Sequence, residues 1–224
     1  MDASSVIAAL SIMILPLIFA ITLHEAAHGF VANRLGDPTA RLLGRVSLNP
    51  IKHIDLIGTV ILPIFMLVAT HFSFLFGWAK PVPVDYRNLR HPRRDMALVA
   101  IAGPVSNLIM ALMWAGLAKS FMILKDYIPA LTNNASAFFW HAGIYGVMIN
   151  CVLMILNLIP IPPLDGSRVV HAVLSPPLAH QYRKIEPYGI WIILGVIFFF
   201  GQYLLFPPVR YLSQLILNLF GIAP

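Results

Sequence analysis

Charged side chains are scarce in this sequence. Asp, Glu, Lys and Arg together make up 11% of its 224 residues, against about 25% in an ordinary soluble domain. Hydrophobic residues account for 59%, and the mean hydropathy is +0.82. This composition excludes a water-soluble enzyme. Apolar runs of about 20 residues, the length needed to cross a bilayer core, recur along the chain, so we expect one integral membrane domain over residues 1–224.

Cysteine is nearly absent, since Cys151 is the only one. A single cysteine excludes both a disulfide framework and a cysteine-rich zinc site. Any metal ion bound by this chain must therefore be held by His, Asp or Glu.

Acidic residues are also few, at 9 against 15 Lys and Arg, and the net charge is +6. The basic residues fall between the apolar runs, where they suit the anionic surface of a membrane. We therefore expect the lipid bilayer as a partner and no nucleic acid.

Five apolar runs are long enough to be membrane segments. They cover residues 5–33, 56–76, 96–118, 137–159 and 188–206. A shorter segment, residues 209–220, places apolar side chains at helical spacing, which is typical of an interfacial helix. These runs predict an all-α polytopic membrane protein.

Basic residues between the runs predict how the chain is oriented. Lys and Arg in short loops mark the cytoplasmic side, and residues 34–54 and 77–95 are both rich in them. If both segments are cytoplasmic, the run between them enters the membrane and returns, with Gly58 and Pro63 as candidate positions for the bend. The alternative is a simple spanning helix, because hydrophobic periodicity does not separate the two cases.

The first run contains the densest cluster of ionisable residues, in the order HEAAH: His24, Glu25 and His28. Residues four apart on a helix share one face, about 6 Å apart along the axis, so both imidazoles can point at one ion. Glu25 is offset by one residue, which lets its carboxylate act as a base for bound water without being a ligand. The alternative is a polar helix end near the headgroups, but burial in hydrocarbon makes an unliganded glutamate costly there.

A catalytic zinc takes three protein ligands and keeps one position open for water. Asp165 is the best candidate for the third ligand, because it follows a long apolar run in the stretch NLIPIPPLDGSR. The prolines there prevent a regular helix, and Gly166 permits close backbone approach. The alternative is a loop aspartate that caps a following helix. Four other histidines fall in basic loops and are predicted to be solvated: His53, His91, His171 and His180.

A second polar motif, AGPVSN, lies near the start of the third run. Gly103 can admit a neighbouring helix closely, and Asn107 offers an amide to a buried carbonyl or a developing oxyanion. Helix packing is the alternative role for both residues. Asn150 and Asn157 on the fourth run are candidates for hydrogen bonds between helices.

HEAAH, AGPVSN and NLIPIPPLDG, in this order, resemble the site-2 protease family of intramembrane zinc metalloproteases. The resemblance implies a three-helix catalytic core over about residues 5–168, accessory helices over about residues 188–220, and one Zn²⁺ held by His24, His28 and Asp165. It also implies that Glu25 is the general base and that Asn107 assists the substrate carbonyl. LLGRVSLNPIKHID and GWAKPVPVD resemble compact prokaryotic members without a PDZ domain, which implies a multi-pass protein of the prokaryotic inner membrane with its site toward the cytoplasm.

A protease of this kind acts on transmembrane proteins, whose helices hide their carbonyl groups in internal hydrogen bonds. An exposed strand edge, or a small membrane-associated β-hairpin, would hold such a substrate extended. The candidate segment is RLLGRVSL, and an ordinary amphipathic loop is its alternative reading: Arg41, Leu42, Leu43, Gly44, Arg45, Val46, Ser47 and Leu48.

A membrane metal transporter that uses the same His/Asp site is the rival function. Transport needs a polar path across the membrane, and the sequence shows no matching set of ionisable residues in the outward half of the runs. Hydrolysis is therefore the favoured prediction.

Overall fold

The computed structural model describes residues 3–69, 77–124, 127–128 and 133–222. The long helices are α1 (Ala3–Arg34), α4 (Pro92–Leu124), α5 (Asn133–Leu158) and α8 (Gly189–Leu204). The shorter ones are α2 (Thr39–Leu42), η1 (Pro50–His53), the π-helix η2 (Leu56–Ile61), α3 (Leu62–Ala69), η3 (Tyr86–Asn88), α6 (Asp165–Val173), α7 (Pro176–Arg183), η4 (Glu186–Tyr188) and α9 (Phe206–Leu219). No β-strand occurs in these described ranges, so the predicted all-α class is confirmed, and the β-hairpin considered as an option is not formed there.

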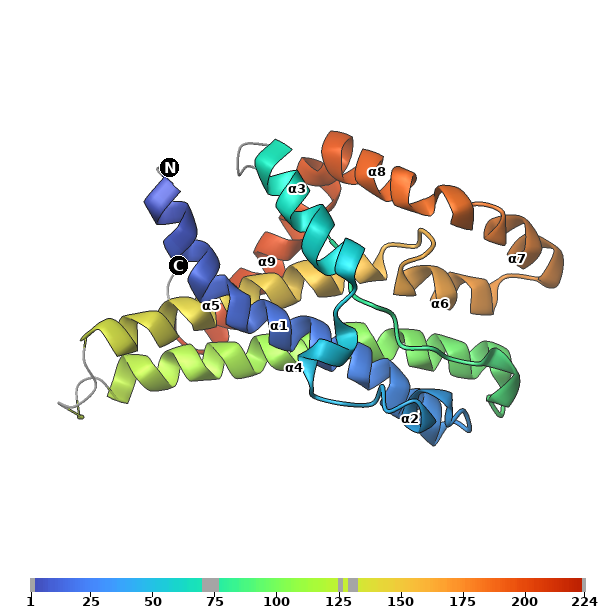
Figure 1. Cartoon of the computed structure of the whole chain (residues 1–224), viewed down its shortest axis with the longest axis horizontal. Coiled ribbons are helices and arrows are strands. Elements are labelled where there is room, and N and C mark those ends of the chain that lie inside the picture. Colours follow the sequence, from blue (N-terminus) through green and yellow to red (C-terminus); the bar gives the residue numbers. More distant parts are fainter. Residues whose placement is uncertain (1–2, 70–76, 125–126, 129–132, 223–224) are drawn as a thin grey trace.

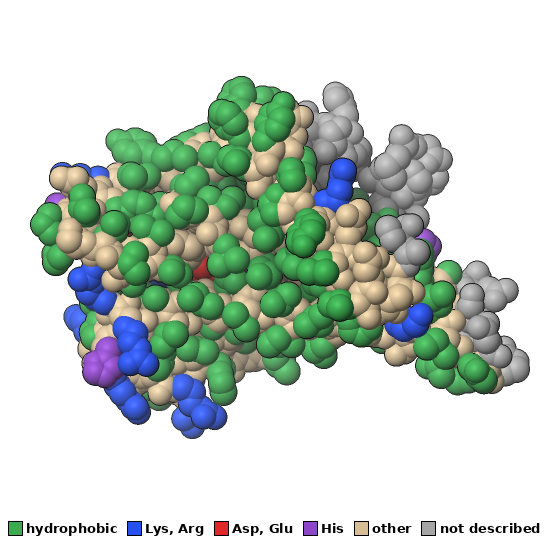
Figure 2. Space-filling view, turned by 180° about the vertical axis from the view of Figure 1, so that it is seen from behind, with side chains coloured by type: hydrophobic (Ala, Val, Ile, Leu, Met, Phe, Trp, Pro, Cys, Tyr) green, Lys and Arg blue, Asp and Glu red, His purple; other side chains and the backbone are tan. Residues whose placement is uncertain are grey.

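Four helical stretches are long and apolar enough to cross a membrane: Leu10–Arg34, Pro92–Leu124, Ala135–Leu158 and Pro176–Leu204. Large apolar side chains on α8 stay exposed, including Trp191 at 73% and Phe198 at 83%. Hydrophobic side chains cover most of the face in Figure 2, while Lys and Arg gather chiefly at one end. Hydrocarbon, rather than water, suits such a surface, and the chain is a multi-pass membrane protein.

Helices α1, α4 and α5 form the predicted three-helix core. In Figure 1, α4 and α5 lie side by side along the long axis, and α1 crosses them obliquely. Small residues let the helices approach: Ala115 and Ala118 are fully buried, and a Cβ added to Gly143 would lie 2.5 Å from that of Ala118. Van der Waals packing through small residues is how helices associate in lipid, where burial of apolar surface gives little drive.

The last helix, α9, for which an interfacial position is predicted over residues 209–220, packs against α4 and α5. Its buried residues Val209, Ile216 and Leu217 belong to the same core cluster as Ala115 and Val147 of α4 and α5. The apolar stripe of α9 thus finds a helix surface as its partner. In contrast, α8 packs mainly on α9 and η4.

The predicted return of the second apolar run is seen at its base. The N–H of Trp78 donates to the carbonyl of Gly58 at 3.0 Å, so the chain comes back to where the segment began. The bend is not at Gly58 or Pro63, which lie inside the continuous helical stretch of η2 and α3. Gly58 instead admits the returning chain, because an added Cβ would lie 2.2 Å from the Trp78 ring. Residues 70–76 of this run lie outside the described residues.

Candidate metal centre

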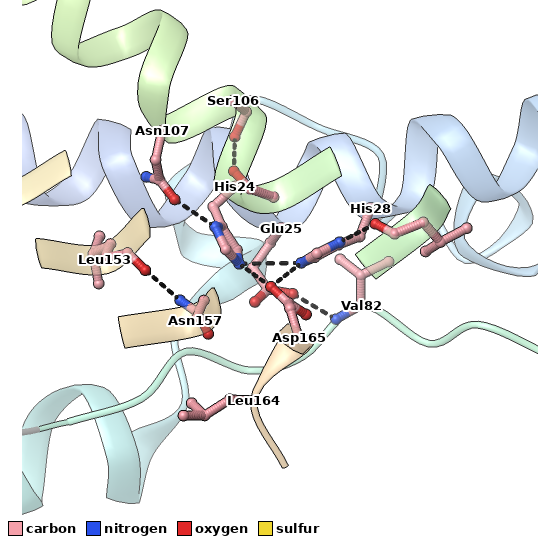
Figure 3. Close-up of polar contacts among 12 residues, drawn as sticks. His24, Glu25, His28, Val82, Ser106, Asn107, Leu153, Asn157, Leu164 and Asp165 are labelled. Carbon is pink, nitrogen blue, oxygen red and sulfur yellow. Dashed lines mark hydrogen bonds and ion pairs between the residues drawn. The ribbon is translucent and has the colours of Figure 1, made fainter. Parts of the chain in front are cut away.

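Two imidazoles from α1 meet at one point. His24 and His28 lie one turn apart, are both buried, and bring their Nε2 atoms within 3.1 Å of each other. Figure 3 shows both rings on the side of α1 that faces α4 and the start of α6. The helical spacing of the HEAAH motif therefore produces the convergence that the sequence predicts.

Asp165 joins the two histidines from the other side of the site. Helix α5 ends at Leu158 before the proline-rich loop, and α6 begins at Asp165 itself. Gly166 lets this turn fold tightly against the end of α5, since an added Cβ would lie 2.3 Å from the Leu158 carbonyl oxygen. The Oδ2 atom of Asp165 lies 3.2 Å from each histidine Nε2. Asp165 does not cap α6, because the N-cap position is Leu164 and has no side-chain cap bond.

The outer nitrogens of both rings are engaged by carbonyl oxygens. His24 Nδ1 lies 2.6 Å from the side-chain oxygen of Asn107, and His28 Nδ1 lies 2.7 Å from the backbone oxygen of Val99. A carbonyl oxygen only accepts, so each Nδ1 carries the proton and donates. Each neutral ring then presents the lone pair of Nε2 toward Asp165.

The three side chains together fit a divalent metal ion. Their ligand atoms lie within 4.8 Å of one another, and the buried Oδ2 of Asp165 has no hydrogen-bond donor. A buried carboxylate oxygen that faces two lone pairs is costly unless a cation lies between them. Two imidazoles and one carboxylate are a ligand set that zinc uses in catalytic sites, with a fourth position left for water. His24, His28 and Asp165 are therefore able to hold the ion.

Gly103 of α4 gives the two rings their room. A Cβ added at this position would lie 2.5 Å from His24 Cε1 and 2.5 Å from His28 Nε2. The close helix approach predicted for Gly103 is thus observed, and it places α4 directly against the metal cluster.

Glu25 lies beside the cluster and not in it. Its Oε2 accepts a hydrogen bond of 2.8 Å from the backbone N–H of Val82, while the cluster of metal-ligating atoms consists of the other three side chains. Sequence reasoning missed Val82, because the Pro-Val-Pro stretch around it has no periodicity that indicates a partner. Figure 3 shows this segment passing beneath Glu25.

Asn107 of α4 is completely buried and forms hydrogen bonds with both other helices of the core, α1 and α5. Its side-chain oxygen accepts from His24, and its amide nitrogen donates to Asn150 Oδ1 at 2.9 Å and to the Ala20 carbonyl at 3.4 Å. The hydrogen bond between helices predicted for Asn150 is therefore confirmed. Asn157 differs from the prediction, since its amide donates to the Leu153 carbonyl within α5, although it lies next to the cluster in Figure 3.

The segment predicted as a substrate strand does not form one. Arg41 and Leu42 end α2, and the chain then turns at Gly44, where φ is +63°. Its apolar side chains are nevertheless exposed, with Leu42 at 79% and Leu48 at 70%. Arg45 donates to the backbone oxygens of Lys80 and Pro81. Pro81 directly precedes Val82, whose N–H donates to Glu25.

His53 also differs from its prediction in this region. It was predicted to be solvated, but it is 1% exposed, and its Nε2 lies 2.9 Å from the Ser47 carbonyl oxygen. The folded loop, which ties Lys80 N–H to the His53 carbonyl, encloses the ring. His91 and His180 are exposed and His171 is half-buried.

Comparisons with known proteins agree with this site. The model of Peptidase family M50 matches residues 115–201. A Bacillus subtilis protein named provisionally as the zinc metalloprotease YwhC is 37% identical over 220 residues, which cover 93% of this chain and 90% of that protein. A Mycolicibacterium smegmatis protein, named provisionally as the zinc metalloprotease Rip2, is 27% identical over 79% of this chain and 62% of its own length.

No solved structure matches the chain. The family model covers the end of α4 through most of α8, and the likeness to the Bacillus subtilis protein extends over nearly the whole chain, including the HEAAH helix. The chain therefore belongs to peptidase family M50, the site-2 protease family, and is a zinc metallopeptidase of the membrane.

Proposed function

We propose that this protease hydrolyses peptide bonds within or next to the transmembrane helices of membrane-protein substrates. The observation that carries the proposal is the position of the metal cluster: His24 and His28 lie inside the spanning stretch Leu10–Arg34 and are buried among α1, α4 and α6. A site at that depth meets segments of other proteins that lie in the membrane.

His24, His28 and Asp165 are the proposed zinc ligands in this mechanism. When bound, zinc supplies a Lewis acid for the scissile carbonyl and lowers the pKa of water toward ~7. Glu25 takes the proton from the attacking water and passes it to the leaving amine. The Val82 N–H holds Oε2 of Glu25, which leaves the other carboxylate oxygen to serve as the base.

Asn107 has two candidate roles that the geometry separates. Its oxygen accepts the Nδ1 proton of His24, which fixes the tautomer whose Nε2 can bind metal. Its amide nitrogen is occupied by Asn150 and Ala20, so stabilising an oxyanion, the role that the family resemblance implies, would require that nitrogen to change partners. We therefore propose orientation of His24 as the primary role of Asn107.

The substrate has to be unwound before its carbonyls become accessible. We propose that residues 41–48 contact it without forming a strand, through the exposed side chains of Leu42, Leu43 and Leu48. Arg45 links this segment to the backbone beside Glu25. We also propose that residues 1–224 form one protease domain, with its site toward the cytoplasm because the adjoining loops are rich in Lys and Arg.

The decisive experiment compares wild type with Glu25→Gln and His24→Ala. Purified proteins are mixed with a library of membrane-helix substrates, and cleavage and zinc content are measured together. Glu25→Gln should keep its zinc and lose about 100- to 10,000-fold in turnover, whereas His24→Ala should lose both. Unchanged cleavage in Glu25→Gln would overturn the assignment.

The same variants distinguish proteolysis from the rival function, metal transport. A transporter should carry zinc into liposomes equally well as wild type and as Glu25→Gln, since transport needs no base. Within the described residues, His24, His28 and Asp165 form the single group of metal-ligating side chains, which provides no second site for a path across the membrane.

A further inference from the structure

A second cavity, with both apolar and charged groups in its lining, lies beside α6 and α7. It has a volume of about 480 Å³, in the range of pockets that hold small ligands, roughly 300–1,000 Å³. None of its lining residues is His24, Glu25, His28 or Asp165. Its walls combine α6, α7 and the proline loop that ends α5 with residues from η3 and α4.

Two arginines without a carboxylate partner line this cavity. The guanidinium of Arg168 on α6 donates to the thioether sulfur of Met96 at 3.4 Å, and a thioether is a weak acceptor. Arg183 of α7 forms no hydrogen bond or ion pair within the described part of the chain. Two guanidinium groups therefore remain able to bind an anion.

Other lining groups restrict what the ligand is. Glu186 adds one carboxylate, which accepts hydrogen bonds and repels a second anionic group, and the imidazole of His171 adds a further donor. Tyr182 also lines the cavity, and its hydroxyl donates to the Pro160 carbonyl at 2.7 Å, which ties α7 to the loop and holds the wall in place. This lining suits an anion that carries hydrogen-bond donors of its own.

The position of the cavity indicates which anion is available to it. It lies at the end of the molecule where α6, α7 and the start of α4 are found in Figure 1, and Figure 2 shows Lys and Arg gathered at that end. In a membrane protein such a basic end lies at the level of the lipid headgroups. Phosphate is the anion available there, and the planar fork of arginine matches its geometry with paired hydrogen bonds.

We propose that Arg168 and Arg183 form a binding site for a phosphate ester whose remaining part carries hydroxyl or ammonium donors. A phospholipid headgroup and a free phosphate ester share this chemistry. The site is independent of the hydrolytic mechanism, so its test does not depend on substrate cleavage.

The test uses the zinc-loaded full chain in maltoside micelles. Native mass spectrometry measures binding of phosphatidylglycerol and of diacylglycerol with the same acyl chains, which lacks the phosphate. Wild type should bind one phosphatidylglycerol in clear preference to diacylglycerol. The double variant Arg168→Gln, Arg183→Gln should bind it about 10-fold or more weakly, because each lost charged hydrogen bond costs about one order of magnitude.

The matched control is the double variant Arg94→Gln, Lys184→Gln. It removes the same charge from exposed residues near the same segments that do not line the cavity, and it should change binding less than about twofold, as expected for screened surface charges. Equal weakening in both double variants would overturn the proposal, and so would equal binding of phosphatidylglycerol and diacylglycerol to wild type. The latter comparison needs no variant, so it decides even if a variant fails to fold.

Glycerol 3-phosphate distinguishes the two sources of the ligand. If it competes with phosphatidylglycerol at the wild-type site, free phosphate esters are ligands as well. If phosphatidylglycerol binds and glycerol 3-phosphate does not compete, the site takes the headgroup of a lipid. Either result supports the phosphate site, provided that Arg168→Gln, Arg183→Gln weakens the binding of phosphatidylglycerol about 10-fold or more.

Discussion

At the scale of single residues, Gly103 shows how little room the metal centre leaves. A methyl group there would lie 2.5 Å from both histidine rings, so the rings or α4 must move. We expect Gly103→Ala to lower zinc affinity about 10- to 100-fold and stability by about 1–3 kcal/mol. Zinc competition with a chelator measures the first effect. Gly116→Ala on the same helix is the control, because its Cβ meets Phe220 at an ordinary 3.5 Å, and an equal zinc loss there would contradict the argument.

Asn107 gives a second prediction at this scale, because it connects His24 to Asn150. Asn107→Ala removes the acceptor for the Nδ1 proton and should lower zinc affinity about 10- to 100-fold. Asn150→Ala leaves that acceptor in place and should have a smaller effect. Zinc titration of the purified variants separates the two roles, since normal zinc affinity with slow turnover in Asn107→Ala would favour the oxyanion role.

The convergence of His24, His28 and Asp165, the proposed zinc ligands, was predictable from sequence because local rules apply to these residues. Helical spacing brings His24 and His28 together, and a proline-rich loop places Asp165 at a helix start. The contacts that orient these groups were not predictable. Val82 binds Glu25 through its backbone, which carries no residue signature, and His53 is enclosed by a loop whose fold depends on long-range hydrogen bonds.

At the scale of elements, the segment that begins with η2 shows that a hydrophobic pattern predicts membrane insertion but not the position of a bend. The pattern predicted membrane insertion, and the charges on both sides predicted the return. The bend could not be placed, because Gly58 serves close packing against Trp78 and Pro63 is accommodated in the helix. A glycine or proline in an apolar run therefore has more than one use, and only the tertiary contacts decide between them.

The carboxylate of Asp37 joins the loop after α1 to the segment that follows Val82. This fully buried carboxylate accepts hydrogen bonds from the backbone N–H of Thr39 and Asp85 and from the Asn88 amide. Burial opposes ionisation, but these hydrogen bonds outweigh it and lower the pKa of Asp37 below its ordinary value. A depressed pKa means that the ionised group stabilises the fold above pH ~4 and that this contribution is lost as the pH falls further.

We therefore expect Asp37→Asn to lower stability at neutral pH by about 1–3 kcal/mol, since one oxygen that accepts hydrogen bonds becomes a donor. Thermal melting in detergent from pH 7 to pH 3 measures the effect. The difference between wild type and variant should shrink as the pH falls below 4, because Asp37 takes up a proton more readily in the unfolded chain than in the folded one, where its pKa is lowered. A constant difference across this range would show that the carboxylate charge does not contribute.

At the scale of the whole molecule, chain direction decides whether the ligands can meet. In Figure 1, α1 and α5 run toward the same end and α4 runs the opposite way. His28 therefore lies near the exit of one helix, Asp165 follows the exit of another, and Gly103 lies near the entrance of the third. All three reach one depth only if the loops before α4 and after α1 lie on one side of the membrane. The Arg90 N–H, which donates to the Leu35 carbonyl at 3.1 Å, joins those loops directly.

Cysteine labelling tests this arrangement in the intact membrane. In a Cys151→Ser background, single cysteines at Lys52 and Arg90 should label from the same side, and a cysteine at the exposed Tyr127, between α4 and α5, should label from the other. The excess of Lys and Arg around the first two positions predicts that their side is the cytoplasm. Labelling of Lys52→Cys and Arg90→Cys from opposite sides would contradict the return of the segment between them. Labelling of both from outside would keep the fold and reverse its orientation, because the contacts that join α1 to α4 do not depend on which side faces the cytoplasm.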